Sequence, residues 1–168
     1  MELDIVTIFR DRKTFERFFY LTKEEQFTRE IWNILKSFDT YYKSKPELDT
    51  IDILDFAAWF RFVTPHCVNP SQAALYNKIF SKLHSHICDT KNVETVMKLF
   101  LEQDYASKIQ DISLGIISKN GRDSIEDVVT LVSKYSTEAS KFDVEDVSLV
   151  TTDILKLLDA TVSGAGLN

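Results

Sequence analysis

The sequence predicts an all-α protein made of a helical bundle, a long antiparallel helical hairpin and a short linker helix. Apolar residues recur every three or four positions along most of the chain, capping residues precede several of these stripes, and nothing in the pattern favours a sheet. The 168 residues, 44% of them hydrophobic and 12% aromatic, can bury a proper core. We expect a bundle over 1–90, a hairpin over 91–141, and an acidic linker, docking helix and flexible tail over 142–168.

The stretch from Asn92 to Ala139 predicts two helices that fold back on each other. The first carries an apolar stripe of about seven turns, and a second stripe follows the break at 119–124. There, Gly121 suits a left-handed C′ position, and Asp123 or Ser124 can cap the next helix. Because the turn is so short, the helices must lie antiparallel and can bury each other's stripes.

This hairpin predicts an interface with other molecules. Its length of about 40 Å is more than the rest of the chain can easily cover. The short helix 154–162 is marginal in water by itself, which favours a docking role. The residues that we expect at the interface are Met97, Phe100, Tyr105, Ile109, Ile112, Ile116, Ile125, Val128, Val132, Tyr135, Ile154, Leu155, Leu157 and Leu158.

The first helices of the bundle follow from caps and stripes. The apolar segment 3–9 is too short to separate a helix from a strand. Asp11 is a plausible N-cap for a helix through Leu21, and 22–25 fits the capped start of a core helix that runs to about Ser44. The side chains that we expect to face inward are Phe15, Phe18, Phe19, Tyr20, Phe27, Ile31, Ile34, Leu35, Phe38, Tyr41 and Tyr42.

Two further helices complete the bundle. The loop 45–50 closes with a capping residue and leads into 51–63, which is apolar nearly all round and should be buried on most sides. Asn69 and Pro70 begin the last helix, because proline suits the first helical position. Its apolar residues are Ala74, Leu75, Ile79, Phe80, Leu83 and Ile87.

Charge and hydropathy limit the classes of partner. The net charge is −6, and residues 89–168 carry all of it, with 8 Lys and Arg against 14 Asp and Glu. Such a surface repels phosphate, so we expect no direct nucleic-acid binding. No apolar run approaches the roughly 20 residues of a membrane span, and the acidic start is unlike a signal peptide, so we expect a cytoplasmic protein without membrane contact.

The chain offers no pattern typical of an enzyme. Its four glycines cannot form either common phosphate-binding loop, so we expect no cofactor site and no catalytic residues. A metal site is one interpretation of the His and Cys residues; surface histidines with free, buried thiols are the other, which the lack of paired ligand spacing favours. These residues are His66, Cys67, His84, His86 and Cys88.

Three features resemble the amino-terminal part of a DnaB-type replicative helicase of bacteriophage kind. The first is the pattern of 15–18 and 27–36, followed by Tyr41-Tyr42 and a loop ending at Pro46. The second is a helical hairpin after a globular bundle. The third is the tail 152–160 with 163–167, which is similar to the segment before the ATPase domain in such helicases.

The resemblance implies a collar domain that helps to form a hexameric ring in a primosome. Its hairpin would pair with a neighbour's hairpin, as a dimer or a ring, and its linker helix would dock on an adjacent motor domain. Primase and helicase loaders are the partners that it implies. ATP and Mg²⁺ would belong only to the motor, which is missing from this chain, and the compartment would be the host cytoplasm.

Two other classes of function remain as alternatives. One is a free-standing helical adaptor or inhibitor of a phage, which binds a host enzyme through the same hairpin. The other is a small metal-dependent enzyme. Continuation of the reading frame into a phosphate-binding motif would favour the helicase, and a complete gene ending at Asn168 would favour the adaptor.

Overall fold

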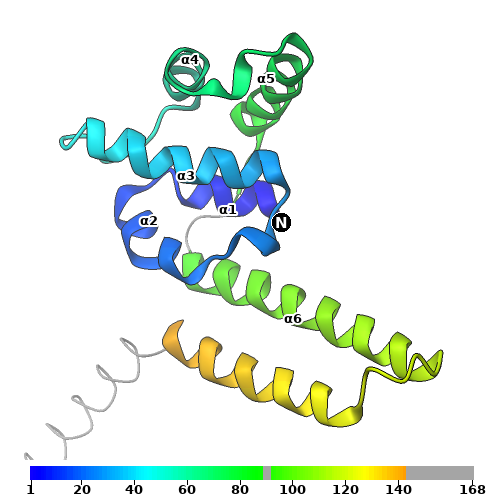
Figure 1. Ribbon diagram of the computed structural model, residues 1–168. Helices are drawn as coiled ribbons and strands as arrows, with labels where there is room; N and C mark the ends of the chain where they lie inside the picture. The colour runs from blue at the N-terminus through cyan, green and yellow to red at the C-terminus, as the bar shows by residue number, and fades with distance from the viewer. Residues whose placement is uncertain (89–91, 143–168) are drawn as a thin grey trace, which may run out of the picture. The chain divides into compact units, whose positions relative to one another are not determined.

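The computed structural model describes residues 1–88 and 92–142, and its named elements are helices, which confirms the predicted all-α class (Figure 1). The chain divides into two compact units, 1–100 and 101–168. The apolar pattern had placed this division about ten residues earlier. The predicted linker beyond Phe142, the docking helix 154–162 and the tail lie outside the described residues.

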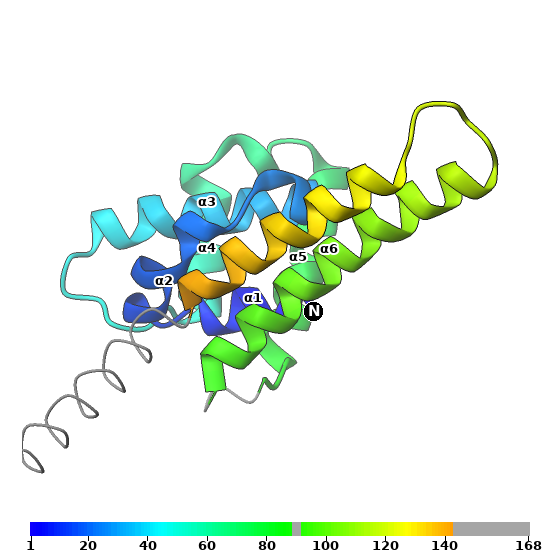
Figure 2. The same ribbon diagram turned by 90° about the horizontal axis from the view of Figure 1, so that it is seen from below.

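The first unit is a bundle arranged around one long helix, α3 (Arg29–Ser44). On one side of α3 lie α1 (Glu2–Ile8) and α2 (Arg12–Phe18), and on the other lie α4 (Ile53–Val63) and α5 (Pro70–Ser85) (Figures 1 and 2). Helix α5 also packs against α1. The first turns of α6 (Val93–Ile117) complete the unit.

Aromatic side chains form most of the core of this unit. Phe38 of α3 meets Phe56 of α4 edge to face, with ring centroids 4.8 Å apart, and Phe56 lies 5.9 Å from Phe80 of α5. On the other side of α3, the Phe15 ring of α2 lies 5.3 Å from that of Tyr42. Such aromatic pairs add to the free energy of burial, and here they connect four helices.

A polar junction fixes the start of α2 to the end of α3. The Arg12 guanidinium donates to the carbonyl oxygens of Tyr42, at 3.1 Å, and Lys45, at 2.6 Å, and also to that of Leu48. The Tyr42 hydroxyl donates to the carbonyl oxygens of Phe9, at 3.0 Å, and Arg10. Burial, and then the Asp11 carboxylate, raise the pKa of Tyr42. We define these contacts as the Arg12–Tyr42 junction.

The helix starts differ from the prediction at two places. Helix α3 begins at Arg29 and not in 22–25, because Glu24–Gln26 is a separate 3₁₀ turn and Phe27 is extended, which lets its ring stack on Trp32. Helix α4 begins at Ile53, because Asp52 supplies the cap, accepting from the amides of Leu54 and Asp55 at 2.9 and 3.0 Å.

Several residues expected in the core are exposed. Tyr20, on the 3₁₀ turn after α2, is 73% exposed. On α4 the prediction of burial on most sides is wrong, since Phe62 is 91% exposed and Leu54 and Val63 also face solvent. Leu75 is exposed, and Ile87 lies beyond the end of α5 and is exposed too. Tyr76, which the apolar pattern had missed, is buried, as are Phe80 and Leu83 of the same helix.

We expect Tyr42→Phe to lower the free energy of unfolding by about 1–3 kcal/mol, because the change leaves the buried carbonyl oxygen of Phe9 without its donor. Tyr20→Phe removes the same hydroxyl at an exposed position and serves as the matched control, with a change near zero. Urea unfolding followed by tryptophan fluorescence measures both. Equal effects of the two variants would contradict the role given to the junction.

Candidate interaction site on the helical hairpin

The second unit contains two helices that lie side by side. The first is the continuation of α6, which ends at Ile117, and the second spans 125–142. They run next to each other in both views (Figures 1 and 2). The Tyr105 and Tyr135 rings meet edge to face across them, with centroids 5.6 Å apart. Because only a short turn joins the helices, they are antiparallel.

The turn is closed by backbone bonds at the end of α6. The Asn120 amide donates to the Gly115 carbonyl, and the Lys119 amide to that of Ile116, each at 3.1 Å, which is the bonding pattern of a Schellman motif. The left-handed C′ residue of this motif is therefore Lys119, with φ 56°, and not Gly121 as predicted. Gly121 is also left-handed, with φ 71°, but lies two residues later.

Side chains organise the rest of the turn. Asn120 Oδ1 accepts from the amides of Arg122 and Asp123 at 3.0 and 3.2 Å, and its Nδ2 donates to Asp123 Oδ2 at 2.6 Å. The second helix starts after Ser124, whose amide donates to Asp127 Oδ2 at 2.9 Å. A Cβ on Gly115 would meet Asp123 Oδ2 and Asn120 Nδ2, so glycine leaves room for this network.

Tyr105 is the centre of the packed face between the two helices. It is 5% exposed, and the Lys108 ammonium lies 5.3 Å from the centroid of its ring. Burial, a side-chain hydrogen bond with Glu138 and the charge of that carboxylate raise the pKa of Tyr105 to about 12. The half-buried residues of the second helix are Val128, Leu131, Tyr135, Glu138 and Ala139.

A small apolar groove opens between the helices beside this contact. It has a volume of about 230 Å³. Its lining includes four of the residues predicted for the interface, Tyr105, Ile109, Val132 and Tyr135, together with Ala106 and the carboxylate-bearing Glu102. The groove is therefore apolar along most of its length and carries a negative charge on its wall.

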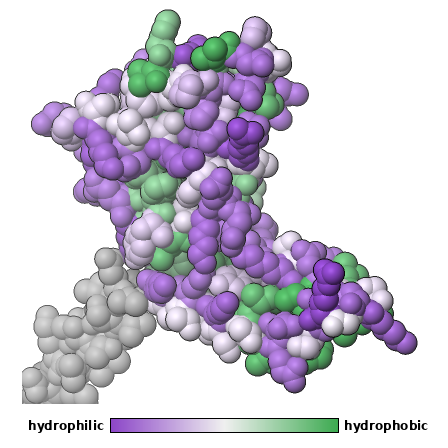
Figure 3. Space-filling view, in the orientation of Figure 1, coloured by the Kyte–Doolittle hydropathy of each residue, from purple (hydrophilic) through white to green (hydrophobic). Residues whose placement is uncertain are grey.

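The second helix also has an apolar stripe that faces solvent. Ile125, Val129 and Val132 occur at i, i+4 and i+7 and are 66%, 59% and 49% exposed. On α6, Leu114 and Ile117 are exposed as well, although they lie off the predicted stripe. Figure 3 shows hydrophobic residues gathered over the part of the hairpin near the turn. We call Ile125, Val129 and Val132 the exposed stripe.

The predicted interface residues fall into three groups. Met97, Phe100 and Tyr105 are buried, which leaves little of them for a partner. Ile109, Ile112, Ile116, Val128 and Tyr135 are half-buried, whereas Ile125 and Val132 are exposed. Ile154, Leu155, Leu157 and Leu158 lie outside the described residues. Leu131, which the pattern had missed, lies on the packed face in place of Val132. The only feature of the sequence that could have predicted this is the helical spacing of residues 128, 131, 135 and 138.

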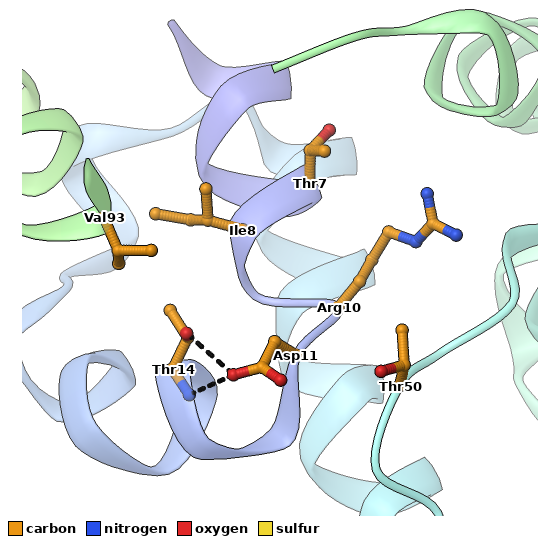
Figure 4. Close-up of a pocket in the computed structure, with 7 residues that line it drawn as sticks. All are labelled: Thr7, Ile8, Arg10, Asp11, Thr14, Thr50 and Val93. Atoms are coloured by element: carbon orange, nitrogen blue, oxygen red, sulfur yellow. Dashed lines mark hydrogen bonds between the residues drawn. The ribbon is translucent and has the colours of Figure 1, made fainter. Parts of the chain in front are cut away.

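A second pocket, of about 360 Å³, lies in the first unit between α1, α2 and the loop before α4 (Figure 4). Four of its polar side chains, those of Thr7, Arg10, Asp11 and Thr14, form hydrogen bonds that stabilise these elements. Asp11 Oδ2 accepts from the amide and the hydroxyl of Thr14, both at 2.9 Å, as the predicted cap of α2. Thr7 donates to the Leu3 carbonyl at 2.7 Å and Arg10 to that of Ile51 at 2.9 Å. These bonds give the pocket a structural role.

The histidines and cysteines have separate environments. The His66 ring stacks on Phe60, and burial, then Lys36 and Arg29, lower its pKa. His86 Nε2 lies 2.7 Å from Asp4 Oδ1. Cys67 and Cys88 do not form a disulfide, and both are half-buried, whereas buried thiols were predicted. Within residues 1–88 and 92–142, no three His, Cys, Asp or Glu side chains are grouped as metal ligands would be.

Comparisons with known proteins add no family to this description. No family model matches the chain, and neither a curated protein nor a solved structure matches it. Among the helices that the structure describes, none is both long and apolar enough to cross a membrane.

We expect opposite effects from two substitutions in the hairpin turn. Lys119→Gly should stabilise the hairpin by about 0.5–1 kcal/mol, because glycine adopts the left-handed conformation without a Cβ penalty. Gly121→Ala should destabilise it by about 1 kcal/mol for the converse reason. Hydrogen exchange of the last α6 amides measures both. Changes of the same sign would contradict the two assignments.

The Asp4–His86 contact predicts that the stability of the fold depends on pH. Burial is the largest single effect and raises the pKa of Asp4, but the hydrogen bonds and charges of His86 and of the Met1 ammonium together lower it below its ordinary 3.8. The contact therefore adds stability above that pH, and loses it as the pH falls through the lowered pKa of the folded state. We expect Asp4→Asn to lower the thermal midpoint at pH 6 and to have a smaller effect below pH 3.8. A constant difference across that range would contradict the assignment.

Proposed function

We propose that the chain is a non-catalytic assembly and partner-docking domain, and that the exposed stripe of its hairpin binds another protein chain. The observation that carries the proposal is the presence of two apolar faces on the helix 125–142. One face packs at Tyr135 against Tyr105, and the exposed stripe lies beside it. A surface helix of a monomer needs only one apolar face, so the second favours a binding role.

The groove beside the stripe strengthens this interpretation. Burying one exposed Val or Ile side chain contributes about 1.5–3 kcal/mol, but association costs several kcal/mol or more in lost freedom. Three side chains alone are therefore a weak interface. Since Val132 belongs to the stripe and also lines the groove, a partner helix can cover the stripe and fill the groove in one contact.

A second copy of the chain is the partner that this surface fits best. A two-fold interface requires one patch to be complementary to itself. The hairpin offers exposed side chains that would act as a ridge, Ile125 and Val129, and a groove lined by Ile109 and Val132, on the same two-helix unit. In a two-fold pair, the ridge of each copy would enter the groove of the other.

The likeness to DnaB-type replicative helicases supplies a biological setting for this assembly. In that family, a helical collar carries a hairpin that pairs with its neighbour's hairpin. The order found along this chain, a helical bundle and then two long helices, supports placing it in that role. We therefore propose a collar that assembles helicase subunits and docks partners such as primase or a helicase loader, without taking part in the chemistry.

We expect Val129→Asp to weaken self-association by about tenfold or more, because it places a charge in an apolar contact. Thr130→Asp adds the same charge to the same helix, off the stripe, and is the matched control. Sedimentation velocity over a range of protein concentrations measures both, and circular dichroism verifies that each variant is folded.

Two results would overturn the proposal. One is a wild-type chain that stays monomeric throughout the concentration range. The other is a loss of self-association that is equal in Val129→Asp and Thr130→Asp, since that would reflect net charge and not the exposed stripe.

A further inference from the structure

The ridge and the groove lie at different levels of the hairpin. The groove is at the level of Tyr105 and Tyr135, which meet across the two helices and both line it (Figure 2). The ridge of Ile125 and Val129 lies nearer the turn. Its midpoint is about seven residues from the midpoint of Val132 and Tyr135, or about 10 Å along the helix. The ridge of one copy is therefore not level with its own groove.

This displacement determines how two copies can pair. In a parallel pair about a two-fold axis, equal levels face each other, so the ridge of one copy meets the ridge of the other. In an antiparallel pair, with the axis midway between the two levels, each ridge meets the groove of the other copy. A parallel arrangement shifted by about 10 Å fills one groove and leaves the second one open. Among these three arrangements, the antiparallel pair alone fills both grooves.

The antiparallel pair brings a cation and a carboxylate of different copies to the same level. Its axis crosses the second helix about midway between ridge and groove, near residue 130, so Arg122 of one copy faces the level of residues 138–139 of the other. Because Tyr105 is level with Tyr135, Glu102 is about level with residue 138. Glu102 lines the groove, and Arg122 lies in the turn, three residues before Ile125. The long side chain of Arg122 can therefore reach Glu102 of the other copy.

Both side chains are free to form this contact. Glu102 and Arg122 are exposed, and in the part of the chain that the structure describes neither side chain has a hydrogen-bond or ion-pair partner. Neighbouring carboxylates are engaged within the hairpin: Glu138 takes part in a side-chain hydrogen bond, and Asp123 accepts from the turn at 2.6 Å. Lys119, also exposed, adds a second cation at the turn. The turn end of the hairpin is thus positive where the groove wall is negative.

Two carboxylates near the ridge do not oppose this arrangement. Glu126 follows Ile125 by about 100° around the helix, whereas Val132 lies about 20° to the other side of Ile125. Glu126 is therefore on the side of the exposed stripe away from the groove. Asp127 accepts from the amide and the hydroxyl of Ser124, at 2.9 and 3.1 Å, and is held at the start of the helix. Neither carboxylate lies between the ridge and the groove that it enters.

We propose that two copies of the hairpin pair antiparallel, and that Arg122 of each copy forms an ion pair with Glu102 of the other. The inference rests on the self-association proposed above and specifies its geometry. The ridge and the groove supply the burial, and the two symmetry-related ion pairs select the antiparallel register. In a parallel two-fold pair, Arg122 would face Arg122 and Glu102 would face Glu102, and both contacts would be repulsive.

The test reverses each charge alone, and then both together, in the full chain. Arg122→Glu and Glu102→Arg each turn two attractive contacts of the pair into repulsive ones. The combined variant restores both contacts with the signs exchanged. Lys134→Glu is the matched control, because it reverses an exposed cation of the same helix that lies about two and a half turns from Ile125, on the opposite side. Sedimentation velocity over a range of concentrations gives the dissociation constants, and circular dichroism verifies folding.

We expect each single reversal to weaken self-association by about tenfold, and the combined variant to return to within about threefold of the wild type. Lys134→Glu should change the dissociation constant little. Glu102→Arg is the most decisive variant, since replacing a negative by a positive charge brings the net charge of −6 to −4. A smaller net charge by itself favours association, so a weakening must come from the local contact.

Three results would overturn the inference: single reversals that associate as tightly as the wild type, a combined variant as weak as either single one, or an equal weakening by Lys134→Glu. Failure of the proposed function looks different. If the register alone is wrong, Val129→Asp still weakens self-association while the charge reversals do not. If the wild-type chain is monomeric at every concentration, both the assembly and its register are overturned.

Discussion

The Arg12–Tyr42 junction is the contact on which the first unit depends. Arg12 donates three hydrogen bonds to carbonyl oxygens where α3 ends, and its guanidinium lies 4.7 Å from the centroid of the Tyr42 ring. The same corner joins the chain before α2 to the loop before α4, since the Ile51 amide donates to the Arg10 carbonyl and the Arg12 amide to the Asp49 carbonyl, each at 2.8 Å. The junction thereby fixes where α4 can begin.

The position of α4 then determines which of its apolar residues are covered. With Ile53, Phe56 and Phe60 directed into the core, α4 is anchored on one face, and Leu54, Ala58 and Phe62 are left on the other. Sequence periodicity shows that α4 is apolar all round, but it does not show whether a second layer covers the helix. In the first unit, α3 and α5 cover only one side, which is why the prediction of general burial failed.

Local signals account for most of what the sequence predicted correctly. Asp11 and Asn69 act as caps, as expected, because each is next to the amides that it accepts from. The errors arise from contacts that are distant in sequence. Helix α4 does not begin at Ile51 as predicted, because the Ile51 amide donates to the carbonyl oxygen of Arg10, which is 41 residues away. Similarly, Phe27 lies before the start of α3 and not within it, because its ring also stacks on Phe100, with centroids 4.9 Å apart.

The two helices of the hairpin were predictable from the sequence, but the face of each helix that packs against the other was harder to predict. Two apolar stripes fit the helix 125–142, one through Val128, Leu131 and Tyr135 and one through Ile125, Val129 and Val132. The partner ring of Tyr105 selects the first, because only one face of the helix can place Tyr135 beside it. The turn shows the same limit: Gly121 was the evident left-handed residue, yet the bonds to Gly115 and Ile116 place Lys119 at the C′ position.

The two exposed apolar surfaces differ in how the charges around them are arranged. The exposed stripe is bordered by charges of both signs, with Arg122 before it and Glu126 and Asp127 within its first turn. Such mixed charge is compatible with a second copy of the same surface, because like charges need not be opposed. On the outer face of α4, which carries Leu54, Ala58 and Phe62, the two signs are separated, because Asp52 and Asp55 lie at the start of the helix and Arg61 in its last turn. An antiparallel arrangement of two such faces would therefore pair unlike charges.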